Sequence, residues 1–248
     1  MDQASFQRPA GRDVPAEPEK TTLDAISATA DQFARLAVEL HDTSGVQETV
    51  DTVVEFALQA LNCSHAGVAL SVRGGPEIPA VTDPVVAEIY KLQLSTRRGP
   101  LVEAMRGQAS ILIADTATDE RWPEWTAKVR ELGVRTVLDV PLTTATGTIG
   151  VLGLYSIEPD AFDADDEAVA RILARHASVA VANARHDESM AQAVDARKLV
   201  GQAMGILMER YGIDGDRAFE VLKRYSQDTN TKLRDVAQQL IETRKLPR

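Results

Sequence analysis

The sequence predicts an α+β domain with an antiparallel sheet, followed by a long helix and an all-α region. Three observations support this prediction. Short apolar runs and a hairpin signal lie between residues 65 and 155, apolar residues recur at helical spacing on both sides of them, and neither Pro nor Gly interrupts residues 165–200. Strands that neighbour in sequence and share a hairpin favour antiparallel pairing, with helices packed on the sheet.

The composition excludes several classes of protein. The 248 residues are 44% apolar but only 4% aromatic, so aliphatic side chains and alanine must fill the core. No run approaches 18 consecutive apolar residues, which excludes a membrane span, and the polar N-terminus lacks the apolar stretch of a signal peptide. A single cysteine, Cys63, excludes an internal disulfide framework and a cysteine-based metal cluster. We therefore expect a cytoplasmic protein.

Charge is distributed unevenly along the chain. The net charge is −10 at pH 7, which argues against a protein that coats nucleic acid over its whole surface. Residues 195–248, however, contain 11 Lys and Arg against 8 Asp and Glu, a local excess of +3. This basic end is a candidate for polyanion binding.

The N-terminal two thirds alternate between helix and strand signals. Residues 1–22 combine Pro, Gly and charges without apolar periodicity and are expected to be a disordered tail. Residues 23–62 have the spacing of two helices separated at 42–45. The expected strands are 65–73, 111–115, 136–142 and 148–155, and the expected helices between them are 84–94, 100–106 and 124–132. A turn around 145–147 joins the last two strands into a hairpin.

A long helix is expected over residues 165–200, beginning with acidic residues that suit a helix N-terminus. Its 3-4-3-4 spacing of neutral side chains gives about three heptads of a coiled-coil seam. The seam residues are Val169, Ile172, His176, Val179, Asn183, His186, Met190 and Ala193. Two interpretations remain open and are compatible: packing on the protein's own sheet, and a dimer interface. We expect a homodimer.

Three short helices are expected in the C-terminal region. Asp214 is the expected cap of the second and Asn230 of the third. The expected inner residues are Val200, Ala203, Ile206, Leu207, Ala218, Phe219, Leu222, Leu233, Val236, Ala237 and Leu240. A core this small needs support from the long helix or from a partner.

Basic and short polar side chains face outward in this arrangement. The candidates for contacts to phosphates or base edges are Arg197, Lys198, Lys223, Arg224, Asn230, Thr231, Lys232 and Arg234. An ordinary solvated surface explains the same residues, because eight acidic residues share the stretch. Charge alone favours that simpler explanation.

The segments G-Q-A-M-G-I-L-M-E-R, A-F-E-V-L and S-Q-D-T-N-T-K-L-R-D-V-A resemble the ANTAR domain. That resemblance implies a three-helix RNA-binding module over residues 187–248, of the kind found in transcription antitermination regulators. It implies binding to paired RNA hairpins in nascent transcripts, and action as a dimer. Met204 departs from the family, which often has Lys there, and so lacks a cation that could contact a phosphate.

The segments R-W-P-E-W, L-G-V-R-T-V-L-D-V-P-L, I-G-V-L-G-L-Y and F-D-A-D-D-E resemble a GAF sensor domain, which we assign to residues 23–186. The resemblance implies a twisted antiparallel sheet, helices on the dimer-forming side, and a small-molecule ligand pocket on the opposite side. The sequence identifies no ligand-binding residue, cofactor or metal site. Trp122 and Trp125 either cover a pocket or pack in the core, and packing is favoured.

Both resemblances together imply a GAF–ANTAR regulator: a signal-responsive, RNA-binding transcription antiterminator. The alternative is a sensor whose C-terminal helical bundle is a protein-interaction or dimerisation module without RNA binding. Salt dependence separates the two, because phosphate contacts release counterions. We expect no enzymatic activity, since no phosphate-binding loop, dinucleotide motif or nucleophile motif is present.

Overall fold

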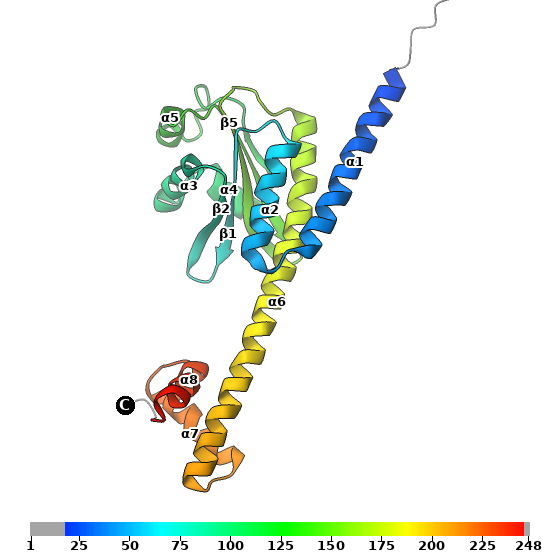
Figure 1. Ribbon diagram of the computed structural model, residues 1–248. Helices are drawn as coiled ribbons and strands as arrows, with labels where there is room; N and C mark the ends of the chain where they lie inside the picture. Colours follow the sequence, from blue (N-terminus) through cyan, green and yellow to red (C-terminus); the bar gives the residue numbers. More distant parts are fainter. Residues whose placement is uncertain (1–17, 246–248) are drawn as a thin grey trace, which may run out of the picture.

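The computed structural model describes residues 18–245, with side chains from residue 29 onward. In Figure 1 a sheet domain lies at one end, a long helix leaves it, and two short helices pack against the far end of that helix. Residues 1–17 of the expected disordered tail lie outside the described residues. Residues 18–22, which were expected to belong to that tail, form the start of the first helix.

The elements follow the predicted order with one addition. They are α1 (Pro18–Asp42), α2 (Gly45–Ala60), β1 (His65–Val72), β2 (Gly75–Val81), α3 (Pro84–Thr96), α4 (Pro100–Gly107), β3 (Ile111–Ile113), α5 (Pro123–Glu131), β4 (Thr136–Thr144), β5 (Gly147–Ser156), α6 (Ala164–Tyr211), α7 (Gly215–Asp228) and α8 (Leu233–Thr243). Strand β2 was not predicted, because Pro76 and Pro79 obscure its strand signal. An edge strand tolerates both prolines, and β2 lies at the edge of the sheet.

The sheet has five antiparallel strands in the order β2-β1-β5-β4-β3. Helices α2 and α6 cover one face, with α1 packed against these two helices, and α3, α4 and α5 lie on the other side (Figure 1). Alternate residues of β4 therefore enter two different cores: Leu138 belongs to the same core as Leu173 of α6, and Val137 belongs to the same core as Tyr90 of α3. The predicted α+β fold is confirmed.

Helix α6 is longer than predicted. It begins at a capping box, in which the Asp163 carboxylate accepts hydrogen bonds from the N–H groups of Asp165 and Asp166. It continues past residue 200 and ends at Gly212, which adopts a left-handed conformation with φ of 61°. Two internal glycines, Gly201 and Gly205, are accommodated within the helix. The predicted long helix and the first helix of the C-terminal region are therefore one element of 48 residues.

The lower part of α6 packs with α7 and α8 around a small core. The fully buried residues there are Ala203, Leu207, Ala218, Leu222, Val236, Ala237 and Leu240. Asp214 caps α7 as predicted, because its carboxylate accepts the Arg217 N–H at 2.8 Å.

Two details of this core differ from the prediction. Phe219 is 37% exposed, since it lies one position, about 100°, away from the buried Ala218 on the helix surface. Asn230 does not cap α8. It takes a left-handed conformation with φ of 50° just after α7, which asparagine tolerates well, and Lys232 occupies the N-cap position.

The continuity of α6 can be tested at Gly205, where an added Cβ would meet no atom within 4 Å. Gly205→Ala is expected to raise the free energy of unfolding by about 0.5–1 kcal/mol, because alanine has less backbone freedom to lose than glycine. Urea unfolding measures this change. Gly212→Ala is the matched control and is expected to destabilise, since φ there is 61°. Destabilisation by Gly205→Ala would show that the helix breaks at that point.

Candidate RNA-binding and sensor sites

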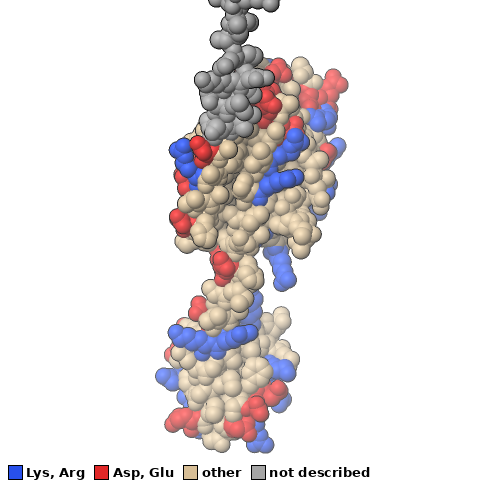
Figure 2. Space-filling view, turned by 90° about the vertical axis from the view of Figure 1, so that its right-hand side faces the viewer, with Lys and Arg blue, Asp and Glu red and all other residues tan. Residues whose placement is uncertain are grey.

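The eight predicted contact residues lie on three helices and one loop. Arg197 and Lys198 are on α6, Lys223 and Arg224 on α7, Arg234 in the first turn of α8, and the remaining three (Asn230, Thr231 and Lys232) in the α7–α8 loop. All are exposed except Thr231, which is half-buried. Figure 2 shows basic and acidic side chains interspersed over this part of the molecule.

The α7–α8 loop is held in one shape by its own hydrogen bonds. The Ser226 hydroxyl donates to the Thr231 carbonyl at 2.6 Å, and the Thr231 N–H donates to the Ser226 carbonyl at 3.0 Å. The Lys232 carbonyl accepts the N–H groups of Asp235 and Val236. Asn230, Thr231, Lys232 and Arg234 are therefore brought together on a preorganised segment.

Ion pairing divides the six basic side chains into two groups. Lys223 pairs with Glu220 at 3.5 Å, Arg224 with Asp228 at 3.7 Å, and Arg234 with Asp235 at 3.1 Å. These pairs are exposed and weak, so a phosphate can replace the carboxylate. Arg197, Lys198 and Lys232 form no ion pair within residues 29–245. Adjacent residues on a helix point about 100° apart, so the six cations do not share one face.

A buried polar cluster that the sequence analysis missed lies beneath α3. The Tyr90 hydroxyl donates to the Gly67 carbonyl at 2.8 Å. A Cβ at Gly153 would lie 2.5 Å from the hydroxyls of Tyr90 and Tyr155 and 2.8 Å from Asp139 Oδ1, so only glycine fits there. Asp139 is fully buried beside the Tyr155 hydroxyl, and burial raises its pKa to about 8. The only sequence signal was an acid inside the apolar strand V-L-D-V.

A cleft of about 150 Å³ opens between the end of α3 and the start of α5. Its lining residues are Leu92, Thr96, Arg98, Arg121, Trp122, Pro123, Glu124 and Trp125. The two tryptophan rings pack edge to face, with centroids 6.4 Å apart. They are buried, as the packing interpretation requires, and they also form a wall of this cleft.

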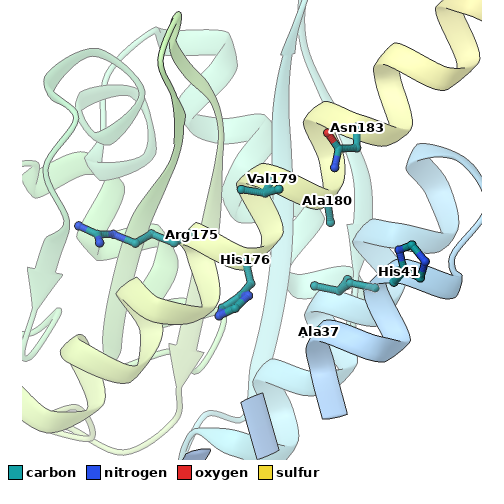
Figure 3. Close-up of a pocket in the computed structure, with 8 residues that line it drawn as sticks. Ala37, His41, Arg175, His176, Val179, Ala180 and Asn183 are labelled. Atoms are coloured by element: carbon teal, nitrogen blue, oxygen red, sulfur yellow. The ribbon is translucent and has the colours of Figure 1, made fainter. Parts of the chain in front are cut away.

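A second groove, of about 390 Å³, runs between α1 and α6 (Figure 3). Its polar lining includes His41 from α1 and His176 and Asn183 from α6, and the His176 ring stacks on Phe33 with centroids 5.8 Å apart. Of the eight predicted seam residues, only Val169 and His176 are half-buried, and the others are exposed. The seam therefore faces solvent, and a different stripe of α6, including Leu173 and Val181, packs on the sheet.

Cys63 is half-buried between α2 and β1. The Cys63 thiol donates to the Ala57 carbonyl at 3.5 Å, and burial raises its pKa to about 11, so it is a protonated, weakly nucleophilic thiol near neutral pH. Within the described residues, no three His, Cys, Asp or Glu side chains are grouped to hold a metal ion. No helix in the same part of the chain has the length and apolarity to cross a membrane.

The Asp139 cluster predicts a pH-dependent stability. Because the folded-state pKa of about 8 lies above the unfolded value of about 3.9, the folded protein holds a proton that the unfolded chain releases. The contribution of protonated Asp139 to stability should be fully present below about pH 4 and should be lost as the pH rises to about 8. Asp139→Asn has no such loss, so its stability relative to the wild type should grow by several kcal/mol across this range, at about 1.36 kcal/mol per pKa unit.

Urea unfolding at a series of pH values measures this difference. Asp216→Asn, at an exposed position on α7, controls for the loss of one carboxylate. A difference between Asp139→Asn and the wild type that stays constant from pH 4 to 8 would contradict the assignment.

Comparison with known families assigns both parts of the chain. Residues 43–182 match the GAF domain family, and residues 188–241 match the ANTAR domain. The two matched regions meet within α6, between residues 182 and 188.

Curated transcription regulators are similar to part of this chain. The chain is 26% identical over 161 residues to the anaerobic nitric oxide reductase transcription regulator NorR of Citrobacter koseri, and 24% identical to that of Escherichia coli O7:K1. These alignments cover 64% of this chain and 32% of each relative, so the chain spans about a third of their length.

Two solved structures share the fold. One is the GAF domain of a Coxiella burnetii phosphoenolpyruvate-protein phosphotransferase, with 18% identity and a TM-score of 0.51 over 65% of this chain and 96% of that one. The other is the Stigmatella aurantiaca phytochrome photosensory core module, with 12% identity and a TM-score of 0.55 over 85% of this chain and 46% of that one. A GAF sensor domain followed by an ANTAR domain is the architecture of a signal-regulated regulator. The GAF match alone covers more than half of the residues of this chain. The chain therefore belongs to the GAF domain family and is a GAF–ANTAR protein.

Proposed function

We propose that this protein is a cytoplasmic, signal-responsive transcription antiterminator, which binds RNA hairpins in nascent transcripts through its ANTAR domain under control of the GAF domain. The main observation in support is that α6 belongs to both domain cores: Leu173 is buried against the sheet, and Leu207 is buried among α7 and α8. A change in the GAF domain thus reaches the ANTAR domain through an unbroken helix. Neither domain is proposed to catalyse a reaction.

The α7–α8 loop is the proposed centre of the RNA site. Lys232 has no competing ion pair within the described chain, and Arg234 has only a weak, exposed one. Both are suited to phosphate contacts, and the Asn230 amide beside them can bond a base edge in an unpaired hairpin loop. Arg197, Lys198, Lys223, Arg224 and Thr231 are proposed as outlying contacts.

Removing two cations at this loop tests the proposal. Lys232→Ala with Arg234→Ala is expected to weaken binding to the hairpin RNA that co-purifies with the protein. The slope of log affinity against log salt should fall by about 1–2, because each phosphate contact releases about one counterion. Gel shift across a salt series measures both quantities.

The matched control is Lys91→Ala with Arg106→Ala, which removes the same charge from exposed positions on GAF-domain helices. The control should retain wild-type affinity and slope. Equal behaviour of the two double variants would show that the loop makes no RNA contact.

One observation favours the alternative of a protein-interaction module. Met208, Tyr211 and Phe219 are exposed apolar side chains near the turn between α6 and α7. If this surface binds a protein and the domain binds no RNA, no hairpin RNA will co-purify, and any binding will show little dependence on salt.

We propose further that the protein is a homodimer. The α6 seam exposes Ile172, Val179 and Met190, and Val194 is exposed one turn beyond Met190. Val38 of α1 is exposed as well. A partner helix lying along this seam would bury apolar area that the single chain leaves in water.

Val179→Glu tests the dimer. Val179 is 62% exposed in the single chain, so glutamate should not disturb the fold of one protomer. In a dimer it would place an unpaired charge in the seam, at a cost of several kcal/mol. Sedimentation should then show mostly monomer. Gln192→Glu, at an exposed position of α6 outside the seam, is the control and should remain dimeric. Wild-type protein that is monomeric at tens of micromolar would rule out the seam.

A further inference from the structure

We infer that the cleft between α3 and α5 binds a small planar aromatic anion, of the aromatic carboxylate class. The inference deepens the proposed function and rests on it in one respect: the GAF domain is taken to be the part of the protein that receives the signal.

The walls select a flat, apolar occupant of limited size. Trp122 and Trp125 present their rings to the cleft beside Pro123 and Leu92. Aromatic side chains favour another ring in an edge-to-face or offset arrangement. The volume of about 150 Å³ is below the roughly 300 Å³ at which pockets begin to hold drug-sized ligands, so it fits one ring rather than a nucleotide or a larger cofactor.

The charges select an anion. Arg98 lines the cleft and forms no ion pair within residues 29–245, so its guanidinium is available. Arg121 lies 4.8 Å from the Trp122 ring centre and is already held by Asp119 at 2.6 Å, so it stiffens the aromatic wall. Glu124 has the opposite sign and is exposed to water, as Arg98 is. The lining residues together, Arg98 and Arg121 against Glu124, carry one net positive charge.

One buried N–H group of a lining residue lacks an acceptor. Trp125 lines the cleft, and its Nε1 is buried without a hydrogen-bond partner among the described residues. An unsatisfied buried donor is costly, so an acceptor oxygen is the group that this residue lacks. A carboxylate supplies two acceptor oxygens together with the charge that Arg98 matches.

The protein contains a built-in probe of this cleft, because its only two tryptophans both line it. Benzoate added to the full-length protein is expected to change the tryptophan fluorescence saturably. Benzamide, which has the same ring and no charge, is expected to bind at least tenfold more weakly. The assay contains no RNA, so its failure would leave the proposed RNA binding untouched.

Arg98→Gln should weaken benzoate binding about tenfold or more, with an unchanged thermal unfolding midpoint. Arg97→Gln is the matched control, because it removes the same charge from the adjacent exposed residue, which does not line the cleft, and it should bind benzoate as the wild type does. The inference is overturned if benzoate causes no saturable change, if benzamide binds equally well, or if the two arginine variants behave alike.

Discussion

The structure depends on one constraint: a single helix must satisfy two separate cores. At about 1.5 Å per residue, the 48 residues of α6 span about 70 Å. Its upper part is buried against the sheet as far as Ala184, and its lower part is buried from Ala203 onward. Between residues 185 and 202 no side chain is fully buried. A helix this exposed gains little stability from its middle turns, so the two cores at its ends hold it in place.

The point at which α6 leaves the sensor domain is marked by a specific contact. Glu188 Oε1 accepts the Val46 N–H at 2.8 Å and so caps the first turn of α2, for which the Ser44 side chain provides no capping bond. Gly45 has φ of 81°, and a Cβ there would lie 2.8 Å from the same carboxylate oxygen. The ANTAR match begins at residue 188, so the last tie to the GAF domain coincides with the start of the second domain.

The sequence predicted what local rules determine and missed what distant residues decide. The β4–β5 hairpin and the Asp214 cap follow from short-range signals, and the structure contains both. Strand β2 was missed because Pro76 and Pro79 mark an edge strand only when the rest of the sheet is known. The end of α6 was placed too early because Gly201 is a breaker by propensity, whereas packing of Ala203 and Leu207 overrides it.

The candidate sites show the same division. Charges such as Lys232 and Arg234 are visible in the sequence, but the ion pair of Arg234 with Asp235 and the hydrogen bonds that fix the loop are visible only in the structure. The Asp139 cluster joins β4, β5 and α3, and the cleft joins α3 to α5, so neither has a contiguous sequence motif. The sequence alone could not decide whether Trp122 and Trp125 cover a pocket or pack in the core. The structure shows that both are buried and that both also line a cleft.

The placement of the two faces of the sheet limits how a signal could travel. The cleft and the Asp139 cluster lie on the α3–α5 side, whereas α6 packs on the opposite side. Strand β4 contributes to both sides of the sheet. Val137 and Asp139 face the α3–α5 side, and Leu138 and Val140 face the α6 side.

A ligand shifts an equilibrium between two arrangements of the protein only by its different affinity for them. A shift from 1:99 to 99:1 requires a preference of about 10⁴-fold. A single-ring anion has few atoms with which to supply that preference. The proposed signal would therefore shift the populations of the two arrangements of α6 only in part. In the proposed dimer even a modest bias would matter, because two RNA sites at a fixed separation bind paired hairpins by avidity.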